Sequence, residues 1–134
     1  MQPFPCSVCQ QLLFFDNSTC LRCGSQLGYI PEDGRLVALC PVESAFERLD
    51  GRPGRFRHCS NRLVARCNWM VPDDHVAERC TSCRLTSVRP NDTEVDSLEA
   101  FADAEAAKRR LLHQLMGLGL PVIDRSVDPL RGVA

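Results

Sequence analysis

Short runs of bulky apolar residues in the first third of the chain predict short β-strands. One run lies at residues 11–15, and two more lie within residues 27–39, on either side of the turn sequence Pro31-Glu32-Asp33-Gly34. Proline followed by acidic residues and glycine between two apolar runs is typical of a β-hairpin. The N-terminal third is therefore predicted to be a set of short antiparallel strands.

Towards the C-terminus the apolar spacing changes to that of a helix, which is predicted from Asp92 to Leu118. Asp92 or Thr93 would cap the N-terminus of this helix. With a rotation of about 100° per residue, the larger apolar side chains lie on one stripe of the helix surface: Leu98, Phe101, Leu112, Leu115 and Met116. Glu105 and Lys108 interrupt that stripe, so they are expected at a solvated edge or facing a partner. The basic residues of the second half suit the helix dipole.

Nine cysteines dominate the remaining chemistry, and eight of them form two sets. The first set has the spacing C-x2-C-x10-C-x2-C and consists of Cys6, Cys9, Cys20 and Cys23. The second ends in another C-x2-C pair and consists of Cys59, Cys67, Cys80 and Cys83. Paired cysteines at this spacing bring two sulfurs onto one metal ion, so each set is predicted to hold one structural Zn²⁺.

Disulfides and redox chemistry explain the cysteines less well than metal does. The count is odd, and the first residues show neither a basic segment nor an apolar segment typical of a secretory signal. A redox C-x-x-C centre normally accompanies a βαβ pattern, which is missing from the sequence. Iron in an all-thiolate site is the alternative to zinc, because the same ligands suit both metals.

Three further residues are alternative ligands for the second site: Cys40, His58 and His75. Cys59 is preferred to Cys40 because it keeps the four ligands close together in sequence. His58 adjoins Cys59, which makes joint ligation of one ion difficult, and His75 is expected in an exposed loop. Cys40 is expected to be a buried thiol. Trp69, the single tryptophan, is predicted to pack over the metal site or against the terminal helix.

The charge of the chain gives little support to nucleic-acid binding. The formal net charge is −1, and because eight thiolates lose eight protons while two Zn²⁺ ions add four charges, the loaded chain would carry −5. Between Arg48 and Arg66 there are six arginines and one acidic residue, Asp50. They could form a docking patch for an anionic partner, but they are better explained as a solvated loop whose arginines balance nearby thiolates and acidic groups.

The predicted fold is a small metal-stabilised α+β protein without a membrane span, expected in the cytoplasm. Its organisation is predicted in four parts: a zinc ribbon at residues 1–40, an Arg-rich connector and second zinc module at 41–90, a helix packed on these modules at 91–120, and an unstructured tail or linker at 121–134. A closed four-cysteine site leaves no ligand position for water, and no H-E-x-x-H motif occurs, so no catalytic residue is assigned.

Four segments together resemble a known family. They are the C-x2-C…C-x2-C-G ribbon at Cys6–Gly24, C-x-N-R…C-N-W-x-V at Cys59–Val71, C-x2-C-R-L at Cys80–Leu85, and E-A-A-K-R-R-L-L followed by L-G-L-P-V over Glu105–Val122. They look like the N-terminal zinc-ribbon region of the bacterial zinc-binding metallopeptidase (peptidase Mx-like) family. The resemblance implies either an N-terminal fragment of a longer protein whose second half carries an H-E-x-x-H-type motif, or a variant that lacks the catalytic part.

Two functions follow as hypotheses. In the first, the chain is a non-catalytic double-zinc module of a metallopeptidase-like protein, and it serves folding and the docking of substrate, of a protein partner or of its own C-terminal half. In the second, it is a stand-alone zinc-ribbon adaptor for nucleic acid or a nucleic-acid machine. The charge balance favours the first hypothesis.

Overall fold

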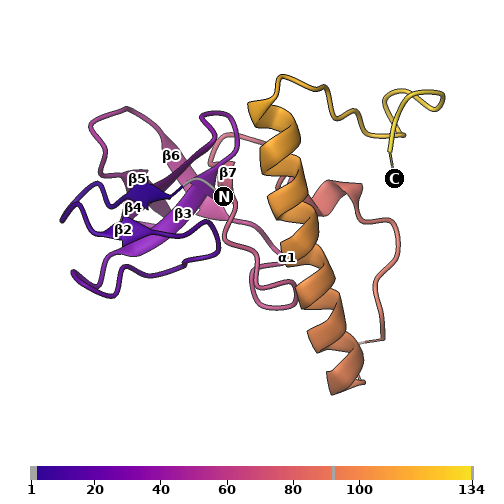
Figure 1. The fold of residues 1–134 in the computed structure, drawn as a ribbon, viewed down its shortest axis with the longest axis horizontal. Coiled ribbons are helices and arrows are strands. Elements are labelled where there is room, and N and C mark those ends of the chain that lie inside the picture. The colour runs from indigo at the N-terminus through magenta and orange to yellow at the C-terminus, as the bar shows by residue number, and fades with distance from the viewer. Residues whose placement is uncertain (1–2, 92, 134) are drawn as a thin grey trace. The chain divides into compact units, whose positions relative to one another are not determined.

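The structure is a computed structural model that describes residues 3–91 and 93–133, and its contacts divide the chain into two compact units. Unit 1 comprises Met1–Cys59 and Asn68–Glu78, and unit 2 comprises Ser60–Cys67 and Arg79–Ala134. Figure 1 shows the ribbon, with strands β2 to β7 and helix α1 labelled. Two four-cysteine clusters, antiparallel strands and one long C-terminal helix confirm the predicted α+β class.

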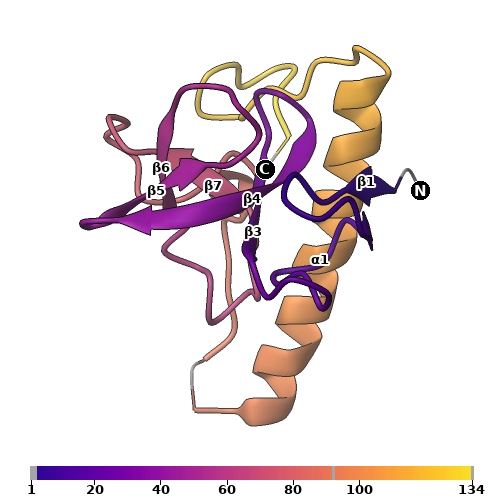
Figure 2. The ribbon, with the colours of Figure 1, turned by 90° about the vertical axis from the view of Figure 1, so that its left-hand side faces the viewer.

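Unit 1 contains two antiparallel sheets. A small one pairs β1 (Phe4–Pro5) with β2 (Leu12–Leu13). The larger sheet follows chain order from β3 to β7, with β3 (Gln26–Ile30), β4 (Arg35–Val42), β5 (Ala45–Arg48), β6 (Arg55–His58) and β7 (Met70–Pro72). Figure 2 shows these strands from a second direction. Each strand pairs with its sequence neighbour, which is the simplest way to build an antiparallel sheet.

The larger sheet curls so that its first strand meets its last. A parallel bridge joins Tyr29 in β3 to Trp69 just before β7, and the Tyr29 backbone N–H donates to the Asn68 carbonyl at 2.8 Å. Pairing the two ends of a sheet satisfies backbone groups that an edge strand would leave open.

The predicted β3–β4 hairpin is confirmed, because Ile30 pairs with Arg35 across the turn and Gly34 has a positive φ of 61°.

The core of unit 1 lies inside this curled sheet. Large apolar side chains from four strands pack together there, namely Ile30, Val37, Leu39, Phe56 and Met70, with Phe46 against them. Gly28 lies in the same core, where a Cβ atom would come within 2.5 Å of Met70 Cγ. A glycine is required at this position because the neighbouring side chain already fills the space.

The stretch at 41–58 differs from the predicted connector, because it contains β5 and β6. The residues of β6 alternate Arg-Phe-Arg-His, and Phe56 points into the core while Arg55 is exposed. This two-residue period is that of a half-buried strand. The high arginine, proline and glycine content of the stretch concealed it.

Unit 2 is built around helix α1, which spans Val95–Gly117 and is preceded by the 3-10 turn η1 (Cys83–Leu85). The predicted helix is confirmed, but it begins at Val95, three residues after the predicted start at Asp92. Glu94 occupies the N-cap position, and its side chain makes no capping hydrogen bond. Of the two predicted caps, Asp92 lies outside the described residues, and Thr93 precedes the cap. At the other end, Gly119 has a positive φ of 71°, as expected after a helix C-terminus.

The apolar stripe on α1 is only partly buried. Leu112 is buried, Leu98, Phe101 and Leu115 are half-buried, and Met116 is 38% exposed. The charged residues that interrupt the stripe are among the better-covered ones. Glu105 is 5% exposed and accepts a hydrogen bond from the Thr86 hydroxyl at 2.8 Å, and the Lys108 ammonium lies 2.8 Å from its carboxylate. The expectation that Glu105 lies at a solvated edge is therefore wrong.

The C-terminal segment, which is predicted to be an unstructured tail or linker, contains a hydrogen-bonded loop. Backbone hydrogen bonds join Arg125 N–H to the Val133 carbonyl at 3.1 Å and Val133 N–H to the Ile123 carbonyl at 2.9 Å, which closes a loop. A Cβ atom at Gly132 would come within 2.4 Å of the Arg125 backbone, so this closure requires glycine. In the described part of the chain, no helix has both the length and the apolar character needed to cross a membrane.

Candidate metal centres

The first candidate centre lies in unit 1 and is formed by two tight turns that carry Cys6, Cys9, Cys20 and Cys23. The turn between β1 and β2 closes when Gln10 N–H donates to the Cys6 carbonyl, and the second closes when Gly24 N–H donates to the Cys20 carbonyl. Gln10 and Gly24 both have positive φ, at 61° and 75°. The two turns therefore have the same backbone geometry, with the chain reversed just after each cysteine pair.

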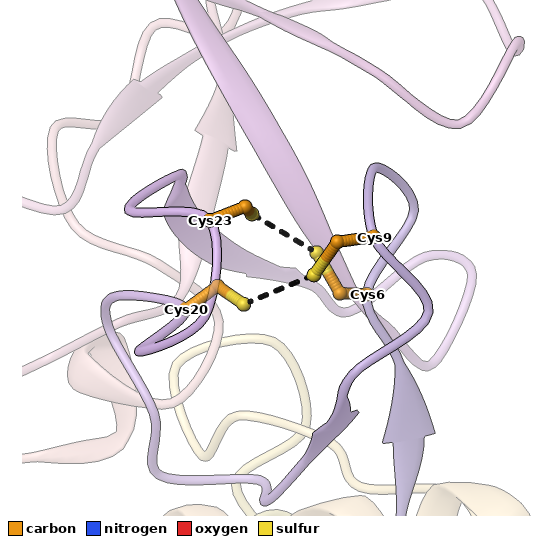
Figure 3. A group of neighbouring side chains, drawn as sticks. All are labelled: Cys6, Cys9, Cys20 and Cys23. Atoms are coloured by element: carbon orange, nitrogen blue, oxygen red, sulfur yellow. Dashed lines mark hydrogen bonds between the residues drawn. The ribbon is translucent and has the colours of Figure 1, made fainter.

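These turns direct four sulfurs towards one point, as Figure 3 shows. The Sγ atoms of Cys6 and Cys23 are 3.8 Å apart, and those of Cys9 and Cys20 are 3.6 Å apart. All four lie within 4.8 Å of one another. Each turn contributes two of the four sulfurs, so an ion bound by all four would hold the two turns together.

The electrostatic environment of this centre is uneven. The hydroxyl of Ser25 lies 3.1 Å from Cys23 Sγ and, with the Ser25 backbone N–H, lowers the pKa of Cys23 to about 6. The pKa of Cys9 is about 11, because burial and the neighbouring cysteine sulfurs raise it more than the backbone N–H of Gln11 lowers it. Crowded thiols resist a second ionisation, and a divalent cation at the centre removes that obstacle.

The second candidate centre consists of Cys59, which follows β6, together with Cys67, Cys80 and Cys83. All four thiols are almost inaccessible, at 0–2% exposure. Cys67 Sγ and Cys80 Sγ are 3.6 Å apart, and the four sulfurs lie within 4.8 Å of one another. The Cys83 backbone N–H is directed at Cys80 Sγ at 3.4 Å, the type of bond that stabilises a thiolate at a metal.

Local backbone geometry also positions this second set. Cys67 ends a turn in which its N–H donates to the Arg62 carbonyl at 3.1 Å, and Arg66 just before it has a positive φ of 48°. Arg84 N–H donates to the Cys80 carbonyl at 3.0 Å, which starts the 3-10 turn η1. The C-x2-C pair is therefore held by its own turn, and Cys67 is held by a separate one.

Both clusters fit a tetrahedral metal ion. Zinc–thiolate bonds of about 2.3 Å place the four sulfurs of a tetrahedron roughly 3.8 Å apart. The observed sulfur separations of 3.6 to 3.8 Å agree with that edge. Four thiolates suit Zn²⁺ and also iron, and they leave no coordination position for water or substrate.

The alternative ligands lie outside both clusters. Cys40 is exposed on β4, which contradicts the expected buried thiol. The His58 ring packs on Phe46 with centroids 4.5 Å apart, and the exposed His75 accepts a hydrogen bond from Ala77 N–H at its Nδ1 atom. No described cluster of metal-binding side chains contains any of these three residues.

Trp69 is fully buried in unit 1 among other aromatic rings. Its ring centroid is 4.7 Å from that of Tyr29 and 6.4 Å from that of Phe15, and the Phe15 ring stands perpendicular to it. The Asn68 side chain before it donates to the Phe15 carbonyl at 2.8 Å. The aromatic contacts of Trp69 are thus with unit 1 residues, which the sequence did not predict.

The arginines between residues 48 and 66 make local contacts. The Arg48 side chain, which is 5% exposed, binds Asp33 at 2.5 Å and Asp50 at 2.6 Å, and this arginine lowers the pKa of Asp50. Arg55 lies 3.3 Å from Glu43, and Arg57 donates to backbone carbonyl groups. Of the two interpretations offered for this stretch, these contacts favour arginines that balance nearby acidic and carbonyl groups.

Comparison with known proteins places residues 3–94 in a zinc-ribbon domain family. Curated relatives include an uncharacterized protein of Mycobacterium bovis and uncharacterized proteins from two strains of Mycobacterium tuberculosis, each 43% identical over 134 residues. The match covers 100% of this chain but 36% of each relative, so the chain spans about a third of their length. No solved structure matches the chain.

Proposed function

The chain belongs to the zinc-ribbon domain family that its residues 3–94 match, and from that premise we propose a non-catalytic module in which two four-cysteine centres each hold one structural Zn²⁺. The observation that supports the proposal most directly is the arrangement of eight cysteine sulfurs in two sets of four, in each of which all sulfurs lie within 4.8 Å of one another. Cys6, Cys9, Cys20 and Cys23 would hold one ion, and Cys59, Cys67, Cys80 and Cys83 the other. Bound zinc supplies a cross-link between distant turns.

In this function the chain's own residues supply thiolates and the hydrogen bonds that stabilise them. Ser25 favours the ionised form of Cys23, and the Cys83 backbone N–H is directed at Cys80 Sγ. Four protein ligands exclude water from each ion, so hydrolytic chemistry of the kind that zinc enzymes perform is not expected at either centre. The module is therefore assigned a structural and binding role.

We further propose that the module is the N-terminal accessory part of a longer metallopeptidase-like protein, where it serves folding and the docking of substrate or of the rest of the protein. Two observations support this proposal. The curated relatives are longer, since this chain covers 36% of their length. The C-N-W and A-A-K-R-R-L segments also resemble the N-terminal region of that peptidase family.

Native mass spectrometry with metal identification tests the metal proposal. Protein purified without added metal is expected to carry two Zn²⁺ ions per chain, and Cys40→Ser, which removes a thiol outside both clusters, is expected to carry the same two. A single ion, or iron in place of zinc, would contradict the assignment. Loss of an ion from the Cys40 variant would mean that the ligand set is different.

Binding measurements test the accessory role. The chain is expected to bind the remaining two thirds of the mycobacterial relative in calorimetry, with an affinity that chelation of the zinc abolishes. Titration with short DNA and RNA at physiological salt is the competing experiment, and weak binding that vanishes with salt is expected there. Specific, salt-resistant nucleic-acid binding together with no binding to the remaining segment would favour the adaptor hypothesis instead.

A further inference from the structure

Arg109 is the most buried charged side chain in unit 2, at 2% exposure on the inner face of α1. Its Nη2 atom donates to the Arg66 backbone carbonyl at 3.2 Å. Among the described residues, its Nε and Nη1 atoms have no hydrogen-bond partner. A neutral carbonyl does not balance a buried positive charge, so this guanidinium requires negative charge nearby.

The carboxylates of α1 close to Arg109 have other partners. Glu105, one turn earlier, lies 2.8 Å from the Lys108 ammonium and also accepts a hydrogen bond from Thr86. Asp103 is exposed and lies 3.7 Å from Arg66. Glu105 and Lys108 neutralise each other, so the helix face that they share with Arg109 keeps one net positive charge.

The second cysteine centre supplies negative charge in the right place. Four thiolates around one Zn²⁺ carry a net charge of −2. The carbonyl that Arg109 binds belongs to the peptide group whose nitrogen is that of Cys67, so the guanidinium is one hydrogen bond and one peptide unit away from a ligand residue. All four thiols of this cluster are buried, so solvent screens their charge little.

We propose that Arg109 is the counter-charge of the second four-cysteine centre and raises its affinity for a divalent metal. The role is that of a positioning residue, because Arg109 acts on the metal through the electrostatic environment of the thiolates. The inference rests on the proposed zinc binding at that centre. In this proposal helix α1 has an electrostatic role, since it places the positive charge of Arg109 next to the second four-cysteine centre.

Two substitutions separate the charge of Arg109 from its hydrogen bond. Arg109→Gln keeps a donor for the Arg66 carbonyl but removes the charge, and Arg109→Lys keeps the charge. Arg66→Gln is the matched control, because it removes an arginine charge next to Cys67 that is 62% exposed. Each protein is titrated with a competing chelator to measure the affinity of both zinc ions, and the spectrum of the cobalt-substituted form is recorded.

Arg109→Gln is expected to lower the affinity of one of the two zinc ions by about 10- to 100-fold. The thiolate-to-cobalt charge-transfer band should move to lower energy, because thiolates lose electrons more easily without the nearby cation. Arg109→Lys should stay within about threefold of the wild type, and the control variant should be unchanged.

An unchanged zinc affinity in Arg109→Gln, or equal losses in the Gln and Lys variants, would overturn the inference. If Arg109→Gln is unfolded at saturating zinc, Arg109→Lys alone decides: retained affinity supports the counter-charge, and a loss of about tenfold or more refutes it. The number of zinc ions on the wild-type protein is measured first. Fewer than two ions there would contradict the metal proposal itself, and this result is distinct from a failure of the Arg109 inference, which appears as an unchanged affinity in Arg109→Gln.

Discussion

Removing one ligand of the second centre should unfold unit 2 and leave unit 1 intact. The perturbation is Cys83→Ser, which replaces a fully buried thiol of the second cluster. Apart from cysteines, the fully buried apolar side chains of unit 2 are few and mostly small: Ala65, Ala102 and Leu112. Unit 1, in contrast, has an aromatic and aliphatic core of its own around Trp69 and Met70.

The magnitudes make the metal the main source of stability in unit 2. Its three fully buried apolar side chains contribute about 4 kcal/mol in total, and the half-buried residues of the helix stripe add about as much again. Ordering the backbone opposes folding by about 1–2 kcal/mol per residue, and hydrogen bonding in the helix offsets this only in part. Structural zinc contributes about 10–16 kcal/mol in small peptides. The contribution of one zinc ion therefore exceeds that of apolar burial in unit 2, so loss of the ion is expected to unfold this unit.

Two spectroscopic probes report on the two units separately. The single α-helix among the described residues, α1, lies in unit 2 and dominates the helical circular dichroism. The single tryptophan of the sequence, Trp69, lies in unit 1 and is 0% exposed, so its fluorescence reports on that core. Cys83→Ser should lose one zinc ion and most of the helical signal, while the fluorescence maximum stays that of a buried indole.

The exposed Cys40 provides the control, since Cys40→Ser should keep both zinc ions and both signals. Two outcomes would refute the reasoning. If Cys83→Ser loses its zinc ion but keeps the full helical signal, packing and not metal holds α1. If the tryptophan fluorescence shifts to that of a solvated indole at the same time, the two units do not fold independently.

Two further predictions concern unit 1. Burial raises the pKa of Tyr29, the single tyrosine, to about 12. The phenol of the unfolded chain has a pKa near 10. The contribution of Tyr29 to stability is therefore fully present below about pH 10 and is lost as the pH rises through about 12. An absorbance titration of the phenolate checks this, and a midpoint near 10 in protein that is still folded contradicts it. Gly28→Ala should destabilise unit 1 by about 1–3 kcal/mol in denaturant unfolding, because the new Cβ overlaps Met70, whereas Gly117→Ala in open space should be neutral or stabilising. Equal effects of the two glycine substitutions would show that the Gly28 site is not tightly packed.

Features that depend on neighbouring residues in sequence were predictable. The C-x2-C turns around Cys6 and Cys80 need only a few residues, and the sequence groups the eight cysteines as the structure does. Helix α1 was found because its period is repeated over several turns. The turn at Pro31 was found for the same reason, since its chemistry is local.

Features that depend on distant residues were missed. Strand β6 is recognisable only once Phe56 has a core to enter, and the aromatic group around Trp69 joins segments that lie far apart in the chain. The sequence also treats Arg109 as one of several basic residues near a helix C-terminus. Its burial follows from contact with the turn at Arg66, which no local pattern encodes.

The division into units has a consequence for how the chain can be cut and made. Unit 2 takes its first segment, residues 60–67, from between β6 and β7, and the chain then returns to unit 1 before it leaves again at residue 79. Truncation at Cys59 would remove β7 and Trp69 from unit 1, so neither unit can be released by a single proteolytic cut. During synthesis, the curled sheet cannot close until β7 has left the ribosome, after the first loop of the second centre has already emerged. The order of translation therefore allows unit 1 to close once residue 78 has emerged, before helix α1 of unit 2 has been made.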